Sequence, residues 1–330
     1  MSDRSDPVPS TAPPGDTPRT AAQLFVDCLE NEGVEFVFGI PGEETLDVSE
    51  ALDRSQLITF VPTRHEQGAA FMADAYGRLT GRPGVCLATL GPGATNLATG
   101  VGDATLDHAP LVALTGQTGL AGMHKETHQF IDVVDMLRPM TKWNTRIHHP
   151  RMVAEAVRKA FNVAAAEKPG ATHLELPEDV METLTAGTPL PRGPQAMVEA
   201  DPVSLLRAAE VIQGARRPVV LAGNGVVRQD AAPALRALCD QTGLHAVTTF
   251  MGKGVLDASD PHFLFTAGLA RQDYPQGLLG QADLVVAVPG EDLLLKMLDL
   301  AEQCTVLSDD ALERRASMGW NSIQGFLHKC

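Results

Sequence analysis

Continuous runs of apolar residues alternate with segments of helical periodicity from Ala21 onward. A parallel strand covered by helices on both faces is apolar along its whole length, whereas a half-exposed strand alternates. The pattern therefore predicts a parallel sheet with helices on both of its faces. The expected strands are 35–40, 57–63, 84–90, 111–117 and 171–177, and the expected helices are 21–33, the segments after Glu43 and Glu66, the segment from Ala94, and 151–168.

A second pattern of the same kind follows residues 183–202, which are rich in Pro and Gly and show no period. Such a segment is typical of a linker. Beyond it, strands are expected at 218–223, 245–250, 282–288 and 305–309, with helices at 203–213 and 231–242. The predicted fold class is α/β, with two doubly wound parallel-sheet domains joined by a Pro/Gly-rich linker. The predicted parts are a disordered tail at 1–19, a first domain at 20–182, the linker at 183–202 and a second domain at 203–330.

The composition of the 330-residue chain narrows the classes of function. Apolar residues make up 44%, enough for sizeable cores, and the net charge of −15 argues against a nucleic-acid or anionic-membrane surface. No apolar run approaches the length of a membrane span, and the Pro-rich residues 1–20 lack the apolar stretch of a secretory signal. The five cysteines form no CxxC pair, so neither a disulfide framework nor a zinc ribbon is expected, and a reducing cytoplasm fits best.

Three loops that directly follow predicted strands carry the candidate chemistry. They contain FGIPGEETLDV (38–48), RHEQGA (64–69) and LGPGATNLATG (90–100). The carboxyl ends of parallel strands share one edge of a sheet, and open α/β folds bind their ligands at this edge. Glycines let backbone approach a ligand closely, and prolines stiffen the turns. Glu66 alone is explained by the first turn of a helix, where acidic residues face unpaired N–H groups. Its convergence with Pro41 and Pro92 indicates a ligand site.

Other motifs are weaker. The 90–100 loop matches neither the nucleotide P-loop nor the GxGxxG fingerprint, and GNGVVR (223–228) has Arg in place of the third Gly. HKETH (124–128) has i,i+4 histidines, but its Glu lies one place later than in the zinc-protease pattern HExxH, so no metal site is predicted there. Spacing supports no Ser-His-Asp arrangement. The residues by themselves therefore predict a cytosolic α/β protein with a ligand edge around Pro41, Glu66 and Pro92.

Several longer segments resemble the acetolactate (acetohydroxyacid) synthase group of thiamine diphosphate enzymes. They are FVFGIPGEETLDV, RHEQGAAFMADAYGRLTG, LGPGATNLATGVGDATLDHAPLVALTGQ and TKWN in the first predicted domain, and RRPVVLAGNGV and AVTTFMGKGVLD in the second. Their order and separations match the family from about Ala21 to Gly290. The resemblance implies that the first domain binds the aminopyrimidine ring of thiamine diphosphate and that the second is the family's middle domain.

The resemblance also implies roles for individual residues. Glu66 falls on the carboxylate that hydrogen-bonds ring nitrogen N1′ and so helps the cofactor lose the proton from its nucleophilic carbon. Pro41 and Gly42 fall near the pyrimidine, Pro92 and Asn96 belong to the matching loop, and Gln129 falls on a glutamine that reaches the substrate. Family members decarboxylate pyruvate and join the two-carbon unit to a second 2-oxo acid. Their site forms between two subunits, which implies a homodimer or a larger assembly.

The sequence departs from the family in two ways. Family members hold Mg²⁺ and the cofactor's diphosphate with a third domain that carries Gly-Asp-Gly and a later Asn-Asn; this sequence contains neither, and the resemblance ends at about residue 290. Mg²⁺ is therefore expected only through a missing or partner domain, such as a separate diphosphate-binding subunit, and the isolated chain is expected to be incomplete for turnover. Lys168 stands where the family has a flavin-contacting arginine. Lysine lacks the planar fork of arginine, which argues against FAD.

Three functions are compatible with these features. The first is an acetolactate synthase-type subunit that works with a diphosphate-binding domain from a separate chain. The second is a non-catalytic remnant that dimerises or binds a small ligand, in which Glu66→Gln would change no measurable binding or activity. The third keeps the cofactor but acts on another 2-oxo acid, and product analysis with different 2-oxo acids separates it from the first.

Overall fold

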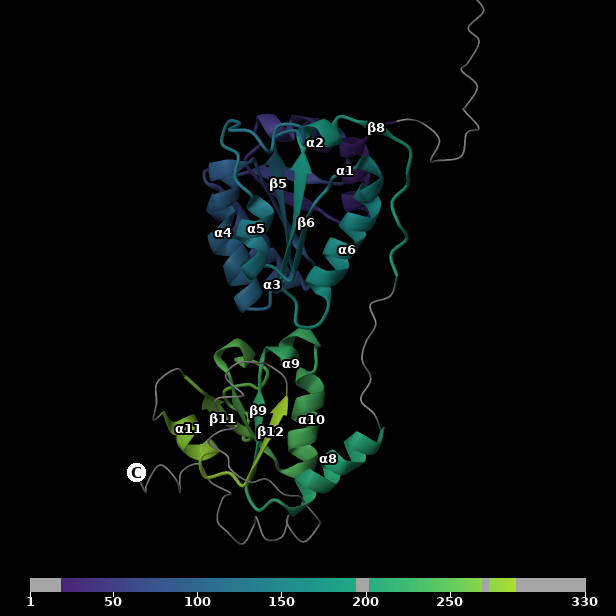
Figure 1. The fold of residues 1–330 in the computed structure, drawn as a ribbon. Coiled ribbons are helices and arrows are strands. Elements are labelled where there is room, and N and C mark those ends of the chain that lie inside the picture. The colour runs from purple at the N-terminus through teal and green to yellow at the C-terminus, as the bar shows by residue number, and fades with distance from the viewer. Residues whose placement is uncertain (1–18, 194–201, 269–272, 289–330) are drawn as a thin grey trace, which may run out of the picture. The chain divides into compact units, whose positions relative to one another are not determined.

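The computed structural model describes residues 19–193, 202–268 and 273–288 (Figure 1). The chain divides into two compact units, Met1–Ala196 (unit 1) and Met197–Cys330 (unit 2), and each has its own sheet and its own core. Several predictions fall outside the described residues: the tail over 1–18, residues 194–201 of the linker, the strand at 305–309 and the atypical region after 290.

Unit 1 contains a six-stranded sheet in which all neighbouring strands are parallel. In spatial order the strands are β3 (Thr59–Pro62), β2 (Phe36–Gly39), β4 (Gly84–Ala88), β5 (Leu111–Gln117), β7 (Ala171–Pro177) and β6 (Trp143–Arg146). The doubly wound α/β architecture predicted from the continuous apolar runs is confirmed, and β5 and β7 match their predicted ranges at both ends. The sequence pattern does not predict β6, because this edge strand is only partly buried and carries Asn, Thr and Arg.

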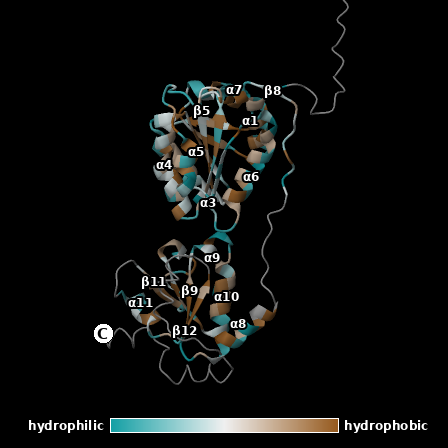
Figure 2. Cartoon of the chain, viewed as in Figure 1, coloured by the Kyte–Doolittle hydropathy of each residue, from teal (hydrophilic) through white to brown (hydrophobic). Residues whose placement is uncertain are grey.

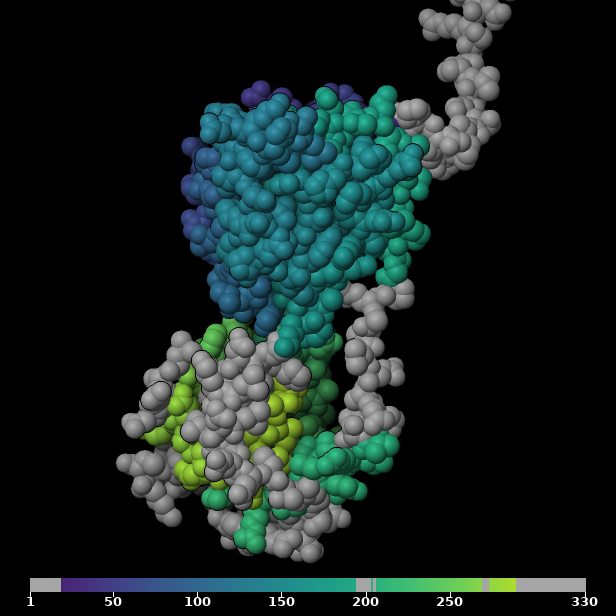
Figure 3. Space-filling view, in the orientation of Figure 1, coloured from purple at the N-terminus to yellow at the C-terminus, as the bar shows by residue number. Residues whose placement is uncertain are grey.

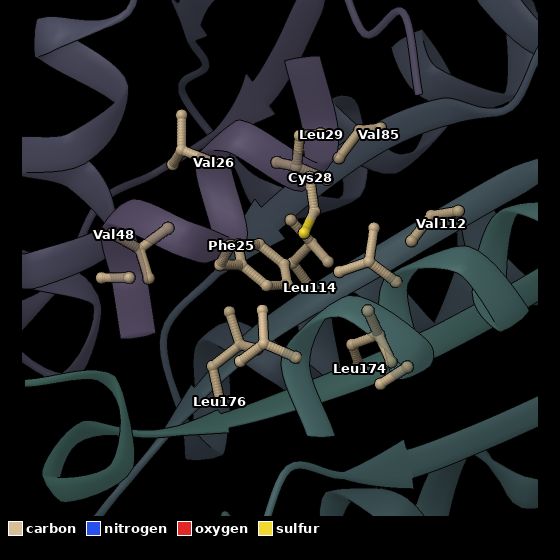
Figure 4. Close-up of a cluster of buried hydrophobic side chains, with 14 of the residues drawn as sticks. Phe25, Val26, Cys28, Leu29, Val48, Val85, Val112, Leu114, Leu174 and Leu176 are labelled. Atoms are coloured by element: carbon tan, nitrogen blue, oxygen red, sulfur yellow. The ribbon is translucent and has the colours of Figure 1, made fainter. Parts of the chain in front are cut away.

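Helices cover both faces of this sheet with their apolar sides turned inward (Figures 1 and 2). On one face, Phe25 and Leu29 of the first helix pack against strand residues such as Leu114 and Leu174 (Figure 4). On the other face, small residues such as Ala70 and Ala73 pack against Cys86 and Ala113. The first face carries α1 (Ala21–Asn31), α2 (Leu46–Arg54), α6 (Val153–Ala165) and α7 (Glu178–Met181); the second carries α3 (Glu66–Thr80), α4 (Gly91–Leu106) and α5 (Val133–Leu137).

Helices α3 and α4 lie unusually close together because small residues face each other between them. A Cβ atom added at Gly100 would lie only 2.6 Å from Cβ of Ala70. Arg78 of α3 then joins the two helices, since its guanidinium bonds Asp74 at 2.8 Å and reaches Asp103 and Asp107 of the α4 region at 2.8 and 2.7 Å. Both helices begin at the carboxyl edge of the sheet, so this packing fixes the two helix starts relative to each other.

The first part of the predicted linker is attached to unit 1. Strand β1 (Arg19–Thr20) pairs antiparallel with β8 (Leu184–Thr185), and Arg19 donates to the carbonyl of Gly187 at 2.6 Å. Further along, Leu190 accepts hydrogen bonds from the side chains of Asn31 and Arg158 at 2.9 and 2.6 Å. These contacts are made to backbone carbonyls, and the periodicity of apolar side chains does not predict such contacts. The domain boundaries inferred from the sequence stay a prediction.

Unit 2 contains a four-stranded parallel sheet in the order β11 (Phe263–Thr266), β10 (His245–Thr248), β9 (Pro218–Ala222) and β12 (Leu284–Val288). Its helices are α8 (Pro202–Gly214), α9 (Asn224–Arg228), α10 (Ala232–Thr242) and α11 (Tyr274–Leu279). The strands predicted at 218–223, 245–250 and 282–288 are confirmed, whereas β11 was not expected from the pattern. None of the helices in the described ranges is long and apolar enough to cross a membrane.

Candidate functional site

The three loops singled out by the sequence meet at the carboxyl edge of the unit 1 sheet. From β2 the chain winds outward to β3, then crosses back over β2 to β4, so the winding direction reverses between β2 and β4. Such a switch point is where open α/β sheets bind ligands. Backbone hydrogen bonds tie the strand ends together, from Thr63 N to Gly39 O at 2.9 Å and from Ile40 N to Leu87 O at 3.3 Å.

Two glycines, Gly42 after β2 and Gly93 in the first turn of α4, both pack on Thr89. A Cβ at Gly42 would lie 2.6 Å from Thr89 Cβ, and a Cβ at Gly93 would lie 2.9 Å from Thr89 Cγ2. Neither position has room for a side chain, because carbon atoms at those distances overlap. The added Cβ at Gly93 would also lie 3.5 Å from Oε1 of Glu66. The structure therefore brings Gly42, Gly93 and Glu66 into one continuous surface around Thr89.

Glu66 is the first residue of α3 and is partly buried. The residue before it, His65, caps the helix by accepting a hydrogen bond from Gln67 N through Nδ1 at 3.1 Å. Asn96 of α4 donates through Nδ2 to Glu66 Oε2 at 3.0 Å. Among the described residues, Oε1 accepts no hydrogen bond and no cation pairs with this carboxylate. One carboxyl oxygen of Glu66 is thus open to a ligand, while the other fixes its orientation.

The two prolines of the predicted site are exposed at the same edge. Pro41 precedes Gly42 in the turn after β2, and Pro92 is the second residue of α4. The sequence placed the start of this helix at Ala94, which is wrong, because α4 already begins at Gly91. Proline fits the first turn of a helix, where its missing N–H would have no intrahelical partner. The backbone N–H groups at the start of α4 therefore point toward the ligand edge.

Gln129 reaches this edge from the long segment between β5 and α5. It is exposed, and its backbone lies in the left-handed region with φ 54°. A Cβ at Gly91, which itself has φ 51°, would lie 2.5 Å from the carbonyl oxygen and 2.9 Å from Cβ of Gln129. Contact with the Gly91 turn thus places Gln129 beside the start of α4. The roles of Glu66, Gln129, Pro41, Gly42, Pro92 and Asn96 stay predictions.

Sequence reasoning missed two residues that the geometry adds to this edge. The hydroxyl of Thr89 donates to the carboxylate of Glu44, which lies in a short 3₁₀ helix after Gly42. A threonine directly after a buried strand was the available signal for this contact.

HKETH (124–128) forms no helix, so the i,i+4 argument does not apply to it. The described parts of the chain contain no group of three or more His, Cys, Asp or Glu suited to a metal ion.

The surface of unit 1 is closed on the side that carries the edge strand β6. Figure 3 shows a continuous layer of teal atoms there, which come from the part of the chain that includes α5, β6 and α6. Beneath this layer the sheet holds buried polar residues, among them Gln117, His173 and Glu175.

Two family models match this chain. Residues 19–136 match the family model described as the N-terminal TPP binding domain of thiamine pyrophosphate enzymes, and residues 205–292 match the model of their central domain.

Individual relatives are similar over most of the chain. A probable acetolactate synthase large subunit of Methanocaldococcus jannaschii is 36% identical over 275 residues, which are 81% of this chain and 46% of the relative. An acetolactate synthase of Bacillus subtilis is 41% identical over 272 residues, 81% of this chain and 47% of the relative. A mitochondrial acetolactate synthase catalytic subunit of Aspergillus candidus is 33% identical over 286 residues, 82% of this chain and 41% of the relative. The chain thus spans about half the length of these relatives.

Proposed function

The chain belongs to the thiamine pyrophosphate enzyme family, and from this premise we propose that it is an acetolactate synthase-type subunit. In this proposal unit 1 binds the pyrimidine end of thiamine diphosphate at the edge formed by Gly42, Glu66 and Gly93. The enzyme decarboxylates pyruvate and joins the two-carbon unit to a second 2-oxo acid. It works as a homodimer or larger assembly in the cytoplasm, without FAD.

The observation that carries the proposal is the open oxygen of Glu66. A pyrimidine ring nitrogen needs one directional partner that can hold a proton, and Glu66 Oε1 accepts no hydrogen bond from any described residue. Asn96 fixes the other oxygen at 3.0 Å, so the carboxyl group keeps its orientation when a ligand is absent. The bare backbone at Gly42 and Gly93 lets a flat ring approach closely. The donor set and the shape of this edge fit the pyrimidine end of the cofactor.

Each residue then has a stated task. Thiamine diphosphate, when bound, supplies the electron sink that lets a 2-oxo acid lose CO₂. Glu66 holds a proton at Oε1 against the ring nitrogen, and general acid–base help of this kind contributes about 10²–10⁴-fold to a rate. Asn96 orients the carboxyl group, and the turns with Pro41 and Pro92 provide stiff walls. Gln129, held against the Gly91 turn, is exposed and available to contact the 2-oxo acid.

The diphosphate end of the cofactor needs further groups. The 330 residues contain no Gly-Asp-Gly and no Asn-Asn, and the chain spans 41–47% of the three relatives described above. In the proposal, Mg²⁺ and the diphosphate are held by protein outside these 330 residues. Calorimetry with thiamine diphosphate and Mg²⁺ tests this: binding should be weak for the chain alone and stronger when the diphosphate-binding protein is added.

The test of the proposed function is the variant Glu66→Gln, which keeps the size of the side chain but cannot hold a transferable proton. The measurement is the exchange of the acidic thiazolium proton of thiamine diphosphate with deuterium, followed by NMR in the complex with the diphosphate-binding protein. We expect exchange to slow by about 10²–10⁴-fold. The matched control is Glu155→Gln, since Glu155 is also an acidic residue in the first turn of a helix, α6, and is exposed.

Two outcomes would contradict the proposal. If Glu66→Gln exchanges as fast as Glu155→Gln, then Glu66 is only a helix-end carboxylate. If the wild-type complex forms no acetolactate from pyruvate but turns over another 2-oxo acid, then the cofactor assignment stands and the proposed substrate is wrong.

A further inference from the structure

Four polar side chains are completely buried on one face of the unit 1 sheet, in the half that lies beside the predicted site. They are Thr115, Gln117, His173 and Glu175, on the adjacent strands β5 and β7. They alternate with apolar residues such as Leu114 and Leu174, which face the α1 side, so the polar set faces the side of α3, α4 and α5. Burial of polar groups is unfavourable unless they are hydrogen-bonded. The hydrogen bonds of these side chains therefore stabilise the surrounding structure.

Gln117 uses its whole amide group. Nε2 donates to the carbonyl of Ile131 at 3.0 Å and to Glu175 Oε1 at 3.1 Å, and Oε1 accepts from the backbone N–H of Thr118 at 3.0 Å. Thr118 is the first residue of the segment between β5 and α5, and Ile131 is the residue before its last, Asp132. A single buried side chain thus clamps both ends of the segment that carries Gln129.

Arg146 completes the arrangement from the edge strand β6. Its Nε donates to Glu175 Oε2, and its Nη2 lies 3.6 Å from Asp132 Oδ1. Asp132 in turn caps α5 by accepting from Asp135 N at 3.1 Å. The guanidinium therefore neutralises the buried carboxylate that bonds Gln117 and also draws in the residue next to Ile131. We call Gln117, Glu175 and Arg146 the clamp.

The clamp determines where Gln129 lies, because Ile131 is only two residues further along the chain. Gln129 has φ 54°, a conformation that non-glycine residues adopt only when their surroundings impose it. Its backbone packs on Gly91 so closely that a Cβ there would lie 2.5 Å from the Gln129 carbonyl oxygen. A loosened segment would move Gln129 away from the start of α4.

We propose that Gln117, Glu175 and Arg146 are positioning residues that hold Gln129 at the substrate side of the site. The role of Gln129 rests on the proposed function, whereas the fixation of segment 118–132 by the clamp does not. Misplacement of a reacting or orienting group by about 1 Å can lower a rate by about 10²-fold. The clamp therefore controls activity through Gln129.

The first experiment measures the segment itself. Gln117→Met keeps the length of the side chain but loses every hydrogen bond of the clamp to Ile131 and Thr118. Amide hydrogen exchange of residues 118–132 should accelerate by at least about tenfold relative to the wild-type chain. The matched control is Thr172→Val, since Thr172 is another fully buried polar residue of β7 whose bonds go to Leu111 and Ala160 instead. If both variants exchange alike over 118–132, the clamp does not fix the segment.

The second experiment links the clamp to Gln129. In the complex with the diphosphate-binding protein, Gln117→Met should lower kcat/KM by about 10–100-fold, and the double variant Gln117→Met/Gln129→Ala should lose no more than Gln129→Ala alone. Additive losses would overturn the proposal, because they would show that Gln117 acts independently of Gln129. A wild-type complex without carboligase activity would contradict the proposed function, and hydrogen exchange would still decide the fixation. If Gln117→Met does not fold, Arg146→Lys, which keeps the charge on the edge strand but loses the Nε donor, takes its place in both experiments.

Discussion

Glu66 and Glu175 lie in the same sheet unit, toward the same carboxyl edge, in very different surroundings. Glu66 belongs to the half formed by the ends of β3, β2 and β4, which we call the ligand half. It is partly buried, and within the described ranges it has one neutral partner, Asn96, and keeps one oxygen open. Glu175 belongs to the half formed by β5, β7 and β6, the framework half. It is fully buried and bonded by Arg146 and Gln117.

The two carboxylates differ in whether the protein itself supplies all of their hydrogen-bond partners. Burial raises the pKa of Glu175, and the hydrogen bond and charge of Arg146, together with the hydrogen bond of Gln117, only partly oppose this. A buried carboxylate must have its oxygens satisfied from within the protein, since an unpaired buried charge is very costly. Glu66 sits where solvent or a ligand can complete its bonding. A polar group that is available to a ligand thus has an acceptor without a hydrogen bond from the protein, whereas a structural polar group has its hydrogen bonds made within the protein.

The largest expected effect tests this contrast through stability. Glu175→Ala leaves the guanidinium of Arg146, only 16% exposed, without its buried partner, so the free energy of unfolding should fall by about 3–5 kcal/mol. Glu66→Ala removes a helix-end charge and the hydrogen bond from Asn96 and should cost about 1–2 kcal/mol. Urea unfolding followed by Trp143 fluorescence reports on unit 1, in a Trp320→Phe background because the chain has two tryptophans. Equal losses for the two variants would contradict the division of the edge into two halves.

The next effect concerns the glycines of the ligand half. Gly93→Ala places a methyl group 2.9 Å from Thr89 Cγ2, so the free energy of unfolding should fall by about 1–3 kcal/mol, as in other overpacked sites. Gly68→Ala is the control, because a Cβ at that exposed position of α3 meets no atom within 4 Å. There the higher helix propensity of alanine should stabilise the protein by up to about 1 kcal/mol. Opposite signs for the two substitutions in the same urea experiment are the expected result, and a stabilising Gly93→Ala would show that the turn tolerates a side chain.

The smallest effect is a pH dependence that arises in the framework half. Burial, assisted by the charge of Arg146, lowers the pKa of His173 to about 3 from the ordinary histidine value of 6.5. The unfolded chain therefore binds a proton near pH 6.5 that the folded chain does not bind until much lower pH. The stabilising effect of the neutral imidazole is fully present above pH 6.5 and is lost as the pH falls toward 3.

Between pH 7 and pH 5.5 this single group should lower the free energy of unfolding by about 1 kcal/mol. His173→Gln should remove that increment, whereas His148→Gln, at an exposed histidine, should not. The measurement compares urea midpoints and m-values of the three proteins at both pH values. An unchanged pH slope in His173→Gln would show that another group titrates there.

Much of the ligand half could be predicted from the sequence. The strands β2, β3 and β4 follow from continuous apolar runs, and the turns after them follow from Pro41, Gly42 and Pro92. These signals are local: a parallel strand must be apolar on both faces, and a loop that turns tightly needs Gly or Pro. Glu66 could be placed in the first turn of a helix after a strand for the same reason. The shared edge of parallel strands then suggested that these residues converge.

The framework half and the connections between residues were decided only by the tertiary structure. Strand β7 lies between β5 and β6, against their order in the chain, and only this arrangement brings Gln117 and Arg146 to opposite sides of Glu175. The sequence likewise does not show that Asn96 bonds Glu66 or that Gln129 packs on Gly91. Apolar periodicity indicates which residues are buried, because burial depends on the face of its own helix or strand on which a residue lies. It does not report partners, because hydrogen bonds between distant segments depend on the order in which the strands assemble.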